Sequence, residues 1–454
     1  MTFDVTLSGD SILNRRVSDV PDARFGRLVS ELRDADVSYT HLETLIHDYH
    51  GPEVYPSAEA GWTWMRSPRE TASELRWLGI DLVSTASNHA LDYGVGGLRS
   101  TWESLDGAGI AHAGTGEDLG AARSPVLLDR RGRRVALVSM TTSLTRSARA
   151  GGSRQDVRGR PGANPLSYTY EVDPATFELV RTLAHRTGRW VERVSATDWL
   201  VNPPGLHNSW TRYRVSEDVV GARMVADERD LAGNLTSIED ACGRADLVVV
   251  HIHNHEWDPD LGLDTPPGFV RVIAQRAIDV GAQVVIAEGS HAPLRGAELR
   301  GDGVILYDPG DLFLMSASVT RFPLDFYERH RDRLEGPPEE ATLSAAWAAR
   351  EGHDVENPPG GYRNHPVNGG VVVRCRFGDD TRLQGVELLP FDWELLPGEH
   401  GKLPRRAGER TATAILERLD ELSRPFGTRV ERWDALGVLR PCDREAVDTD
   451  SSVA

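Results

Sequence analysis

The chain has 454 residues, and its proportions of 39% hydrophobic and 26% charged residues are typical of a globular protein with a sizeable core. Its formal net charge of −18 disfavours a nucleic acid as the main partner, because phosphate binding requires a basic surface. The same charge disfavours adhesion to an anionic membrane. We therefore expect neither nucleic acid nor a membrane among its partners.

The sequence offers no segment for export or membrane insertion. Its start lacks a charged and apolar leader, and it contains no run of about 18 apolar residues. The cytoplasm is therefore the expected location. The three cysteines, Cys242, Cys375 and Cys442, are too few and too scattered for a disulfide framework or a thiolate metal site. Any metal would have to be held by oxygen atoms and imidazoles.

Apolar runs and amphipathic stretches alternate in the first part of the chain. The predicted elements are strands over 3–7, 35–43, 80–86 and 134–140 and helices over 25–34, 71–78 and 97–107. The alternation returns further on, with helices over 238–245 and 269–280 and strands over 246–253, 283–287 and 303–307. This order predicts a layered α/β fold with the strands in the middle.

Composition divides the chain into four predicted parts. Residues 1–142 and 238–330 are expected to form one catalytic domain, because both carry the alternating pattern. Residues 143–237 break that pattern, apart from one predicted helix over 174–186, and are interpreted as an insertion or lid over the site. A C-terminal extension with paired strands and a helix is predicted over 331–442, and a disordered tail over 443–454.

Polar residues gather where the predicted strands end. They are Asp10, Glu43, Asn88, His89, His251, His253, His255 and His291. A single strand-end Asp is usually a turn former or a helix cap, and a single His is usually structural. Open α/β sheets bind ligands at the carboxyl ends of their strands, and a packed core has no use for this much polarity. Together these residues predict a functional site.

The order of these residues resembles that of the calcineurin-like metallophosphoesterases. The matching pieces are Gly9-Asp10, Leu42-Glu43, the Asn88–Gly94 box (NHALDYG), His253 and Gly289-Ser290-His291. Within that superfamily the chain is most similar to the branch of CapA-type proteins of poly-γ-glutamate synthesis. The resemblance implies an α/β calcineurin-like metallophosphatase sandwich, in which helices flank two packed sheets, with an inserted lid and a C-terminal extension.

The resemblance also implies roles for individual residues. Asp10 and His291 would serve one metal position and Asn88 and His253 a second, with Glu43 as the bridge and His89 as the acid/base imidazole. The chain departs from the family pattern, because Ile12 and Gly289 stand where two imidazole ligands are expected. The expected cofactor is therefore a single divalent cation in an oxygen-rich site, either Mn²⁺, Ca²⁺, Mg²⁺ or Zn²⁺.

Several functions remain open at this point. In length and modified motifs the chain is most similar to the enzymes of this branch that epimerise the C-terminal residue of a lasso-type ribosomal precursor peptide. That resemblance implies a metal-dependent isomerase that inverts Cα by two-base proton exchange, with the precursor peptide as partner. The alternative is a metallophosphoesterase or metal-dependent amide hydrolase related to capsule poly-γ-glutamate synthesis. A purely binding role is disfavoured, because binding does not require titratable groups at five strand ends.

Epimerisation needs an acid/base group on each face of the reacting carbon. His89 and His291 are the predicted pair, each assisted by a carboxylate such as Asp10 or Asp92, with His253 and His255 in reserve. The sequence specifies neither the peptide nor the oligomeric state.

Overall fold

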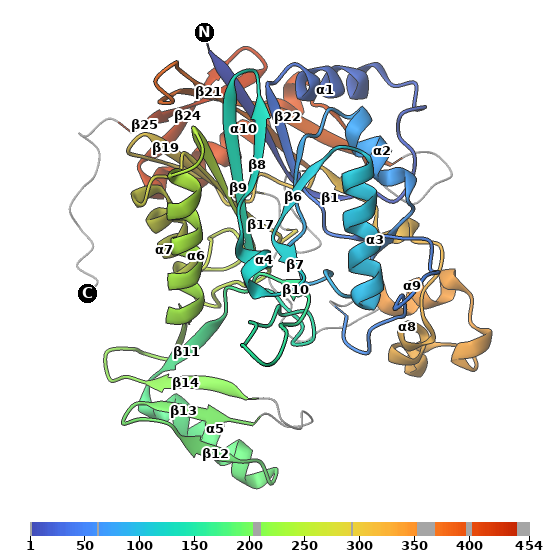
Figure 1. The fold of residues 1–454 in the computed structure, drawn as a ribbon, viewed down its shortest axis with the longest axis vertical. Helices are drawn as coiled ribbons and strands as arrows, with labels where there is room; N and C mark the ends of the chain where they lie inside the picture. The colour runs from blue at the N-terminus through green and yellow to red at the C-terminus, as the bar shows by residue number, and fades with distance from the viewer. Residues whose placement is uncertain are drawn as a thin grey trace.

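The structure is a computed structural model that describes residues 2–60, 63–202, 210–291, 294–351, 368–395 and 402–442. Two large β-sheets pack face to face, and helices cover their outer faces (Figure 1). The central core between the sheets contains apolar side chains of both, including Leu7, Leu137, Val249 and Ile286. The predicted α/β sandwich with flanking helices is confirmed.

The first sheet has ten strands, and β1 lies in its middle. Along one side of β1 run parallel neighbours, and along the other side run antiparallel ones. The strands, in spatial order, are β24 (Thr428–Trp433), β25 (Leu436–Pro441), β22 (Leu383–Leu395), β21 (Gly369–Phe377), β1 (Phe3–Ile12), β2 (Val37–His41), β5 (Leu82–Ser84) and β6 (Ala111–Ala113); β20 (Phe313–Leu314) pairs with β1 and β23 (Lys402–Arg406) with β22.

The second sheet has six strands, and its four central strands are parallel. In spatial order they are β18 (Ala297–Arg300), β19 (Gly303–Tyr307), β17 (Val284–Glu288), β16 (Leu247–His253), β9 (Arg133–Thr141) and β8 (Val126–Arg130). Short pairs join β3 (Leu45–Ile46) to β4 (Arg66–Ser67) and β7 (Thr115–Gly116) to β10 (Gly162–Ala163). Because the parallel strands of both sheets end at one edge of the sandwich, their terminal residues meet there.

Amphipathic helices cover the outer faces of both sheets. Phe25, Leu75 and Leu105 of α1 (Ala23–Arg33), α2 (Glu70–Trp77) and α3 (Gly94–Gly107) pack on the first sheet. Ile238 and Ile273 of α6 (Glu228–Cys242) and α7 (Gly268–Asp279) pack on the second. The remaining helices are α4 (Leu119–Arg123), α5 (Pro174–Arg186), α8 (Leu324–Arg329), α9 (Leu343–Glu351) and α10 (Glu409–Ser423).

Strand β1 is longer than the sequence predicted, and this changes the setting of Asp10. The alternating pattern predicted a strand over 3–7, whereas β1 runs to Ile12 because β20 pairs with Ser11 and Ile12 from a segment 300 residues away. Asp10 therefore lies inside a strand, opposite His41 of β2. The strand fixes its backbone more firmly than a loop would.

Residues 168–226 form a separate five-stranded sheet, which projects from one end of the molecule (Figure 1). Its strands are β11 (Tyr168–Val172), β12 (Val191–Arg193), β13 (Asp198–Val201), β14 (Thr211–Val215) and β15 (Ala222–Ala226), and α5 packs on them. The sequence predicted only α5 here, since these strands are short and only partly buried. Helix α6 begins at Glu228, ahead of the expected start at residue 238.

The segment 331–442 was expected to form an extension. It supplies five of the ten strands of the first sheet, β21 to β25. Strand β21 lies between β1 and β22, and its residues Val371, Val373 and Phe377 belong to the core between the two sheets. A local pattern of residues reveals a strand but not its distant partner. The predicted disordered tail over 443–454 lies outside the described residues. Within the described ranges, no helix is both long and apolar enough to cross a membrane.

The placement of β21 predicts the effect of truncation. A chain ending at residue 330 removes β21–β25 and leaves one side of β1 without its hydrogen-bonded neighbour, so we expect it to lose cooperative thermal unfolding, as measured by circular dichroism. A chain ending at residue 442 keeps every described strand and is the control, expected to melt like the full chain. Cooperative melting of the shorter chain at the full-length midpoint would contradict this placement.

Candidate metal centre

The predicted site residues converge at the edge where the parallel strands end. Contacts of 3.8 Å or less connect all of the predicted catalytic and metal-ligating side chains. They are Asp10, Glu43, Asn88, His89, Asp92, His253, His255 and His291. The two sheets both contribute, so the site closes only when the sandwich is assembled.

Glu43 is the centre of this arrangement. Its carboxylate is 0% exposed and follows β2 directly. Oε1 lies 3.3 Å from Nε2 of His255 and 3.6 Å from Nε2 of His253, and Oε2 lies 3.3 Å from Nε2 of His291. Burial would raise the pKa of Glu43, but the charges and hydrogen bonds of these imidazoles outweigh it and hold the pKa well below its usual value.

His89 is held by its own carboxylate. Its Nδ1 lies 2.6 Å from Oδ2 of Asp92, which also accepts a hydrogen bond from the backbone N–H of Met65. Nε2 of His89 points towards the centre, 3.8 Å from Glu43 Oε1. Burial alone would lower the pKa of His89, but Asp92 and then Glu43 outweigh it and raise that pKa. The orientation of the imidazole is therefore fixed by Asp92.

His291 is held in a similar way from the second sheet. Its Nδ1 lies 3.2 Å from Asp311 and 3.7 Å from Asp10, while its Nε2 faces Glu43. Burial opposes protonation, yet Glu43 and Asp311 raise the pKa of His291 well above its usual value. The backbone of His291 has a φ of 50°, a left-handed conformation that residues other than glycine seldom adopt. Such strain is common at functional sites.

His253 and His255 approach each other beside Asn88. Nε2 of His253 lies 3.0 Å from Oδ1 of Asn88 and 3.1 Å from Nε2 of His255. The His255 backbone N–H donates to Ser143, and buried Arg295 donates to the side chain of Asn254 and to the Glu256 carbonyl. These hydrogen bonds fix a loop that brings a further imidazole to the centre.

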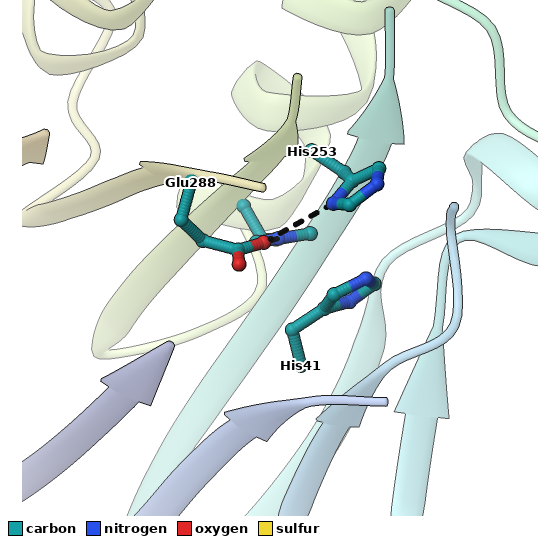
Figure 2. A group of neighbouring side chains, drawn as sticks. His41, His253 and Glu288 are labelled. Atoms are coloured by element: carbon teal, nitrogen blue, oxygen red, sulfur yellow. Dashed lines mark hydrogen bonds and ion pairs between the residues drawn. The ribbon is translucent and has the colours of Figure 1, made fainter. Parts of the chain in front are cut away.

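A second tier of polar side chains lies beneath, and no ligand or catalytic role was predicted for its members His41, His251 and Glu288. Figure 2 shows His41, His253 and Glu288 of this tier, which extend from β2, β16 and β17 towards one another. His251 donates to or accepts from Glu288 Oε1 at 2.5 Å and Ser139 Oγ at 2.9 Å. The alternation of side chains along a strand could have revealed this tier. His41 and His251 each precede a predicted site residue by two positions, so along a continuous strand each would point to the same face as that residue.

Asp311 is a further site residue that the sequence did not indicate. It follows β19 in the segment Asp308-Pro309-Gly310-Asp311 and is 2% exposed, beside His291. Its position after a strand of the second sheet is the same signal that indicated the other strand-end residues. It was missed because the segment also fits an ordinary turn.

The chemistry of these groups fits a divalent cation. Asp10, Glu43, Glu288 and Asp311 are all at most 2% exposed and lie close together. Burial, followed by the charges of Glu288 and Glu43, raises the pKa of Asp10 well above its usual value. Among the described residues, neither oxygen of Asp10 has a hydrogen-bond partner. A cation held by these carboxylates, with Asn88 and the imidazoles, would offset their repulsion.

The glycine that replaces an expected imidazole has a steric reason. A Cβ on Gly289 would lie 2.6 Å from Nδ1 and 2.7 Å from Cε1 of His253, and the residue has a φ of 119°. The ring of His253 therefore occupies the space that a side chain at position 289 needs. An imidazole for the same part of the site comes instead from His255.

Comparison with known proteins matches most of the chain to one family. The model described as "Bacterial capsule synthesis protein PGA_cap" matches residues 4–315. The uncharacterized proteins y4sH and y4uA of Sinorhizobium fredii are each 32% identical over 96% of this chain and 93% of their own length. A "Probable polyglutamine synthesis accessory protein" of Mycobacterium tuberculosis is 29% identical over 51% of this chain and 44% of its own.

The contact between Gly289 and His253 predicts a specific defect. Gly289→Ala should displace the His253 ring and weaken divalent-cation binding by about tenfold or more, the usual cost of disturbing groups that orient a metal-binding histidine. Gly281→Ala is the matched control, because Gly281 has the same φ of 119° but lies away from the site. Isothermal titration with Mn²⁺ should separate the two variants. Equal affinities would contradict the steric argument.

Proposed function

The chain belongs to the bacterial capsule synthesis protein PGA_cap family, and from this premise we propose that it is a metal-dependent peptide epimerase. Its substrate would be a ribosomal precursor peptide of the lasso type, and its reaction the inversion of Cα in the C-terminal residue. The proposal rests on the family resemblance and on the arrangement of imidazoles about Glu43.

One observation carries the proposal. Two imidazoles approach different oxygens of Glu43, His89 at 3.8 Å from Oε1 and His291 at 3.3 Å from Oε2. The other nitrogen of each ring is held by a carboxylate, Asp92 in one case and Asp311 in the other. Two positioned acid/base groups about one centre are what inversion of a carbon requires, since one proton leaves and another arrives on the opposite face.

A divalent cation completes this proposal. Asp10, Glu43, Asn88 and His253 would hold it, in a set of carboxylate, amide and imidazole donors that suits Mn²⁺, Ca²⁺, Mg²⁺ or Zn²⁺. When bound, such an ion supplies positive charge for the terminal carboxylate of a peptide and for the enolate that forms beside it.

The protein's own residues would then move the protons. One imidazole of the pair His89 and His291 accepts the α-proton, and the other donates a proton to the opposite face. Asp92 and Asp311 fix the tautomers of these rings, so that Nε2 of each faces the reacting carbon. His253 would contribute by binding the cation, His255 stays in reserve as an acid/base group, and Asp10 lies beside His291.

Two features support a peptide as the substrate class. The name of the Mycobacterium tuberculosis relative refers to a polymer of an amino acid, which is chemically a chain of amides. The separate sheet of residues 168–226 has β12 and β15 as its edge strands, and edge strands can pair with an extended peptide. Trp190, which immediately precedes β12, is 75% exposed and could contact such a peptide.

A second candidate is hydrolysis of a phosphoester or an amide. It is favoured by the group Glu43, His255 and His291, whose donor atoms all lie within 4.8 Å of one another and could hold another ion. Two neighbouring ions would clamp the attacking and leaving oxygens of a hydrolytic reaction. His255 would then be a metal ligand in place of the imidazole missing at Gly289.

Deuterium exchange distinguishes the two candidates. In D₂O an epimerase should place one deuterium at the C-terminal Cα of a candidate precursor peptide, without cleavage, and should approach one isomer ratio from either direction. His89→Ala and His291→Ala should each abolish inversion, while one of them retains exchange on a single isomer. Mass spectrometry and chiral chromatography measure these outcomes.

The control for these variants is His112→Ala, which removes an imidazole from β6 outside the site and should leave exchange unchanged. Release of phosphate from a phosphodiester, or cleavage of the peptide, with no deuterium uptake in any peptide would decide for the second candidate.

The metal dependence has its own test. Asn88→Ala and Glu43→Ala should lower the exchange rate by about tenfold or more, because each removes a proposed ligand. Their far-UV circular dichroism should stay near that of the wild type, since neither belongs to the apolar core. Added Mn²⁺ or Ca²⁺ should restore a chelator-treated wild-type sample. Full activity in a sample shown to be metal-free would contradict the proposed role of the cation.

A further inference from the structure

Beneath the proposed catalytic centre lies a compact group of donors that the proposed reaction does not use in full. It consists of His41, His251, His253 and Glu288 and is called here the inner histidine cluster. One donor atom from each residue lies within 4.8 Å of every other, and all four side chains are at most 1% exposed. Each residue comes from a strand, so the cluster has a rigid frame.

His41 is the member that ordinary packing leaves unexplained. Its ring lies against those of His251 and His253, with centroids at 4.5 and 4.7 Å. It is 0% exposed, and its Nε2 lies 3.5 Å from Oδ1 of Asp10, beyond ordinary hydrogen-bond distance. Neither nitrogen makes a hydrogen bond to a side chain of the described residues. Burying polar atoms without partners is unfavourable, so a native protein seldom keeps several of them in one place.

A purely orienting role accounts for only part of the cluster. Oε1 of Glu288 lies 2.5 Å from His251 Nε2 and 3.5 Å from His253 Nδ1, so Glu288 can orient the ring of His253. That role requires nothing of His41, which would pack equally well as an apolar aromatic residue. Three imidazoles and one carboxylate are instead the donor set of a borderline divalent cation such as Zn²⁺.

We propose that the inner histidine cluster is a second cation site, which binds Zn²⁺ through His41, His251, His253 and Glu288. The site goes beyond the proposed epimerase reaction and does not depend on it. With both sites filled, His253 would join them as an imidazolate that has released its ring proton to solvent, because its Nδ1 faces Glu288 while its Nε2 faces Asn88 and Glu43. The inner ion would be structural, since all four of its proposed ligands come from the protein and are buried.

The surrounding charges are compatible with this assignment. Oδ1 of Asp10 lies 3.5 Å from Nε2 of His41, so a second carboxylate adjoins the cluster. A divalent cation with Glu288 retains one positive charge, which Asp10 would offset. Ser139 contacts Nδ1 of His251 and leaves the other nitrogen of that ring to the cluster.

Metal analysis of the full chain tests the site. Chelator-treated protein is titrated with Zn²⁺, and bound metal is measured by mass spectrometry after gel filtration. Wild type and Asn88→Ala should both retain a tightly bound equivalent of Zn²⁺, because Asn88 belongs only to the outer site. His41→Phe and Glu288→Gln should lose it, whereas His112→Phe, the same substitution on β6, should keep it. X-ray absorption of the bound Zn²⁺ should report three imidazoles.

The zinc measurements test the inner site independently of the proposed function, because that function is tested by deuterium exchange. If the His41→Phe variant folds and binds as much Zn²⁺ as the His112→Phe variant, the proposed inner site is wrong. If His41→Phe does not fold, Glu288→Gln, which keeps the shape of the side chain, gives the same decision. X-ray absorption showing fewer than two imidazoles would also overturn it.

Discussion

The site depends on the burial of carboxylates that repel one another. Asp10, Glu43, Glu288 and Asp311 are at most 2% exposed, and a buried carboxylate persists only where positive charge or hydrogen-bond donors compensate it. Histidines surround Glu43, and its pKa is well below the usual value. Burial and neighbouring carboxylates raise the pKa values of Asp10 and Glu288 instead. A cation would relieve this conflict, so that metal binding would contribute directly to folding stability.

Strand register turns this requirement into a defined geometry. Asp10 pairs with His41 across β1 and β2, and His253 pairs with Glu288 across β16 and β17. Because side chains of a strand alternate between its faces, residues two positions apart point the same way. His251 therefore lies beneath His253 on the same strand, and the strands build two tiers of donors. The central core of the sandwich holds the two sheets, and hence the two halves of the site, in place.

Much of the sandwich and of the outer site could be predicted from the sequence, because both depend on local patterns. Apolar runs revealed β16 and β19, and the Asn88–Gly94 box indicated the family. What depends on distant pairing could not be predicted. The position of β21 beside β1 involves segments about 370 residues apart, and the extension of β1 by β20 involves segments about 300 apart. The pattern within a single strand carries no information about such distant partners. Asp311 was missed because its segment also fits a turn.

The site has an imidazole at His255 and none at position 289, where the family pattern expects one. This difference bears on the chemistry that the site can support. His253 excludes a side chain at Gly289, and the imidazole that replaces it comes from His255, whose side chain is 27% exposed. The backbone of His255 is held by Ser143, but its side chain is more exposed than those of Asp10, Glu43 and Asn88, which are buried. The proposed outer site therefore combines a buried ion position with a side that faces solvent. In the proposed reaction, this exposed side is where a carboxylate-bearing substrate would meet the ion.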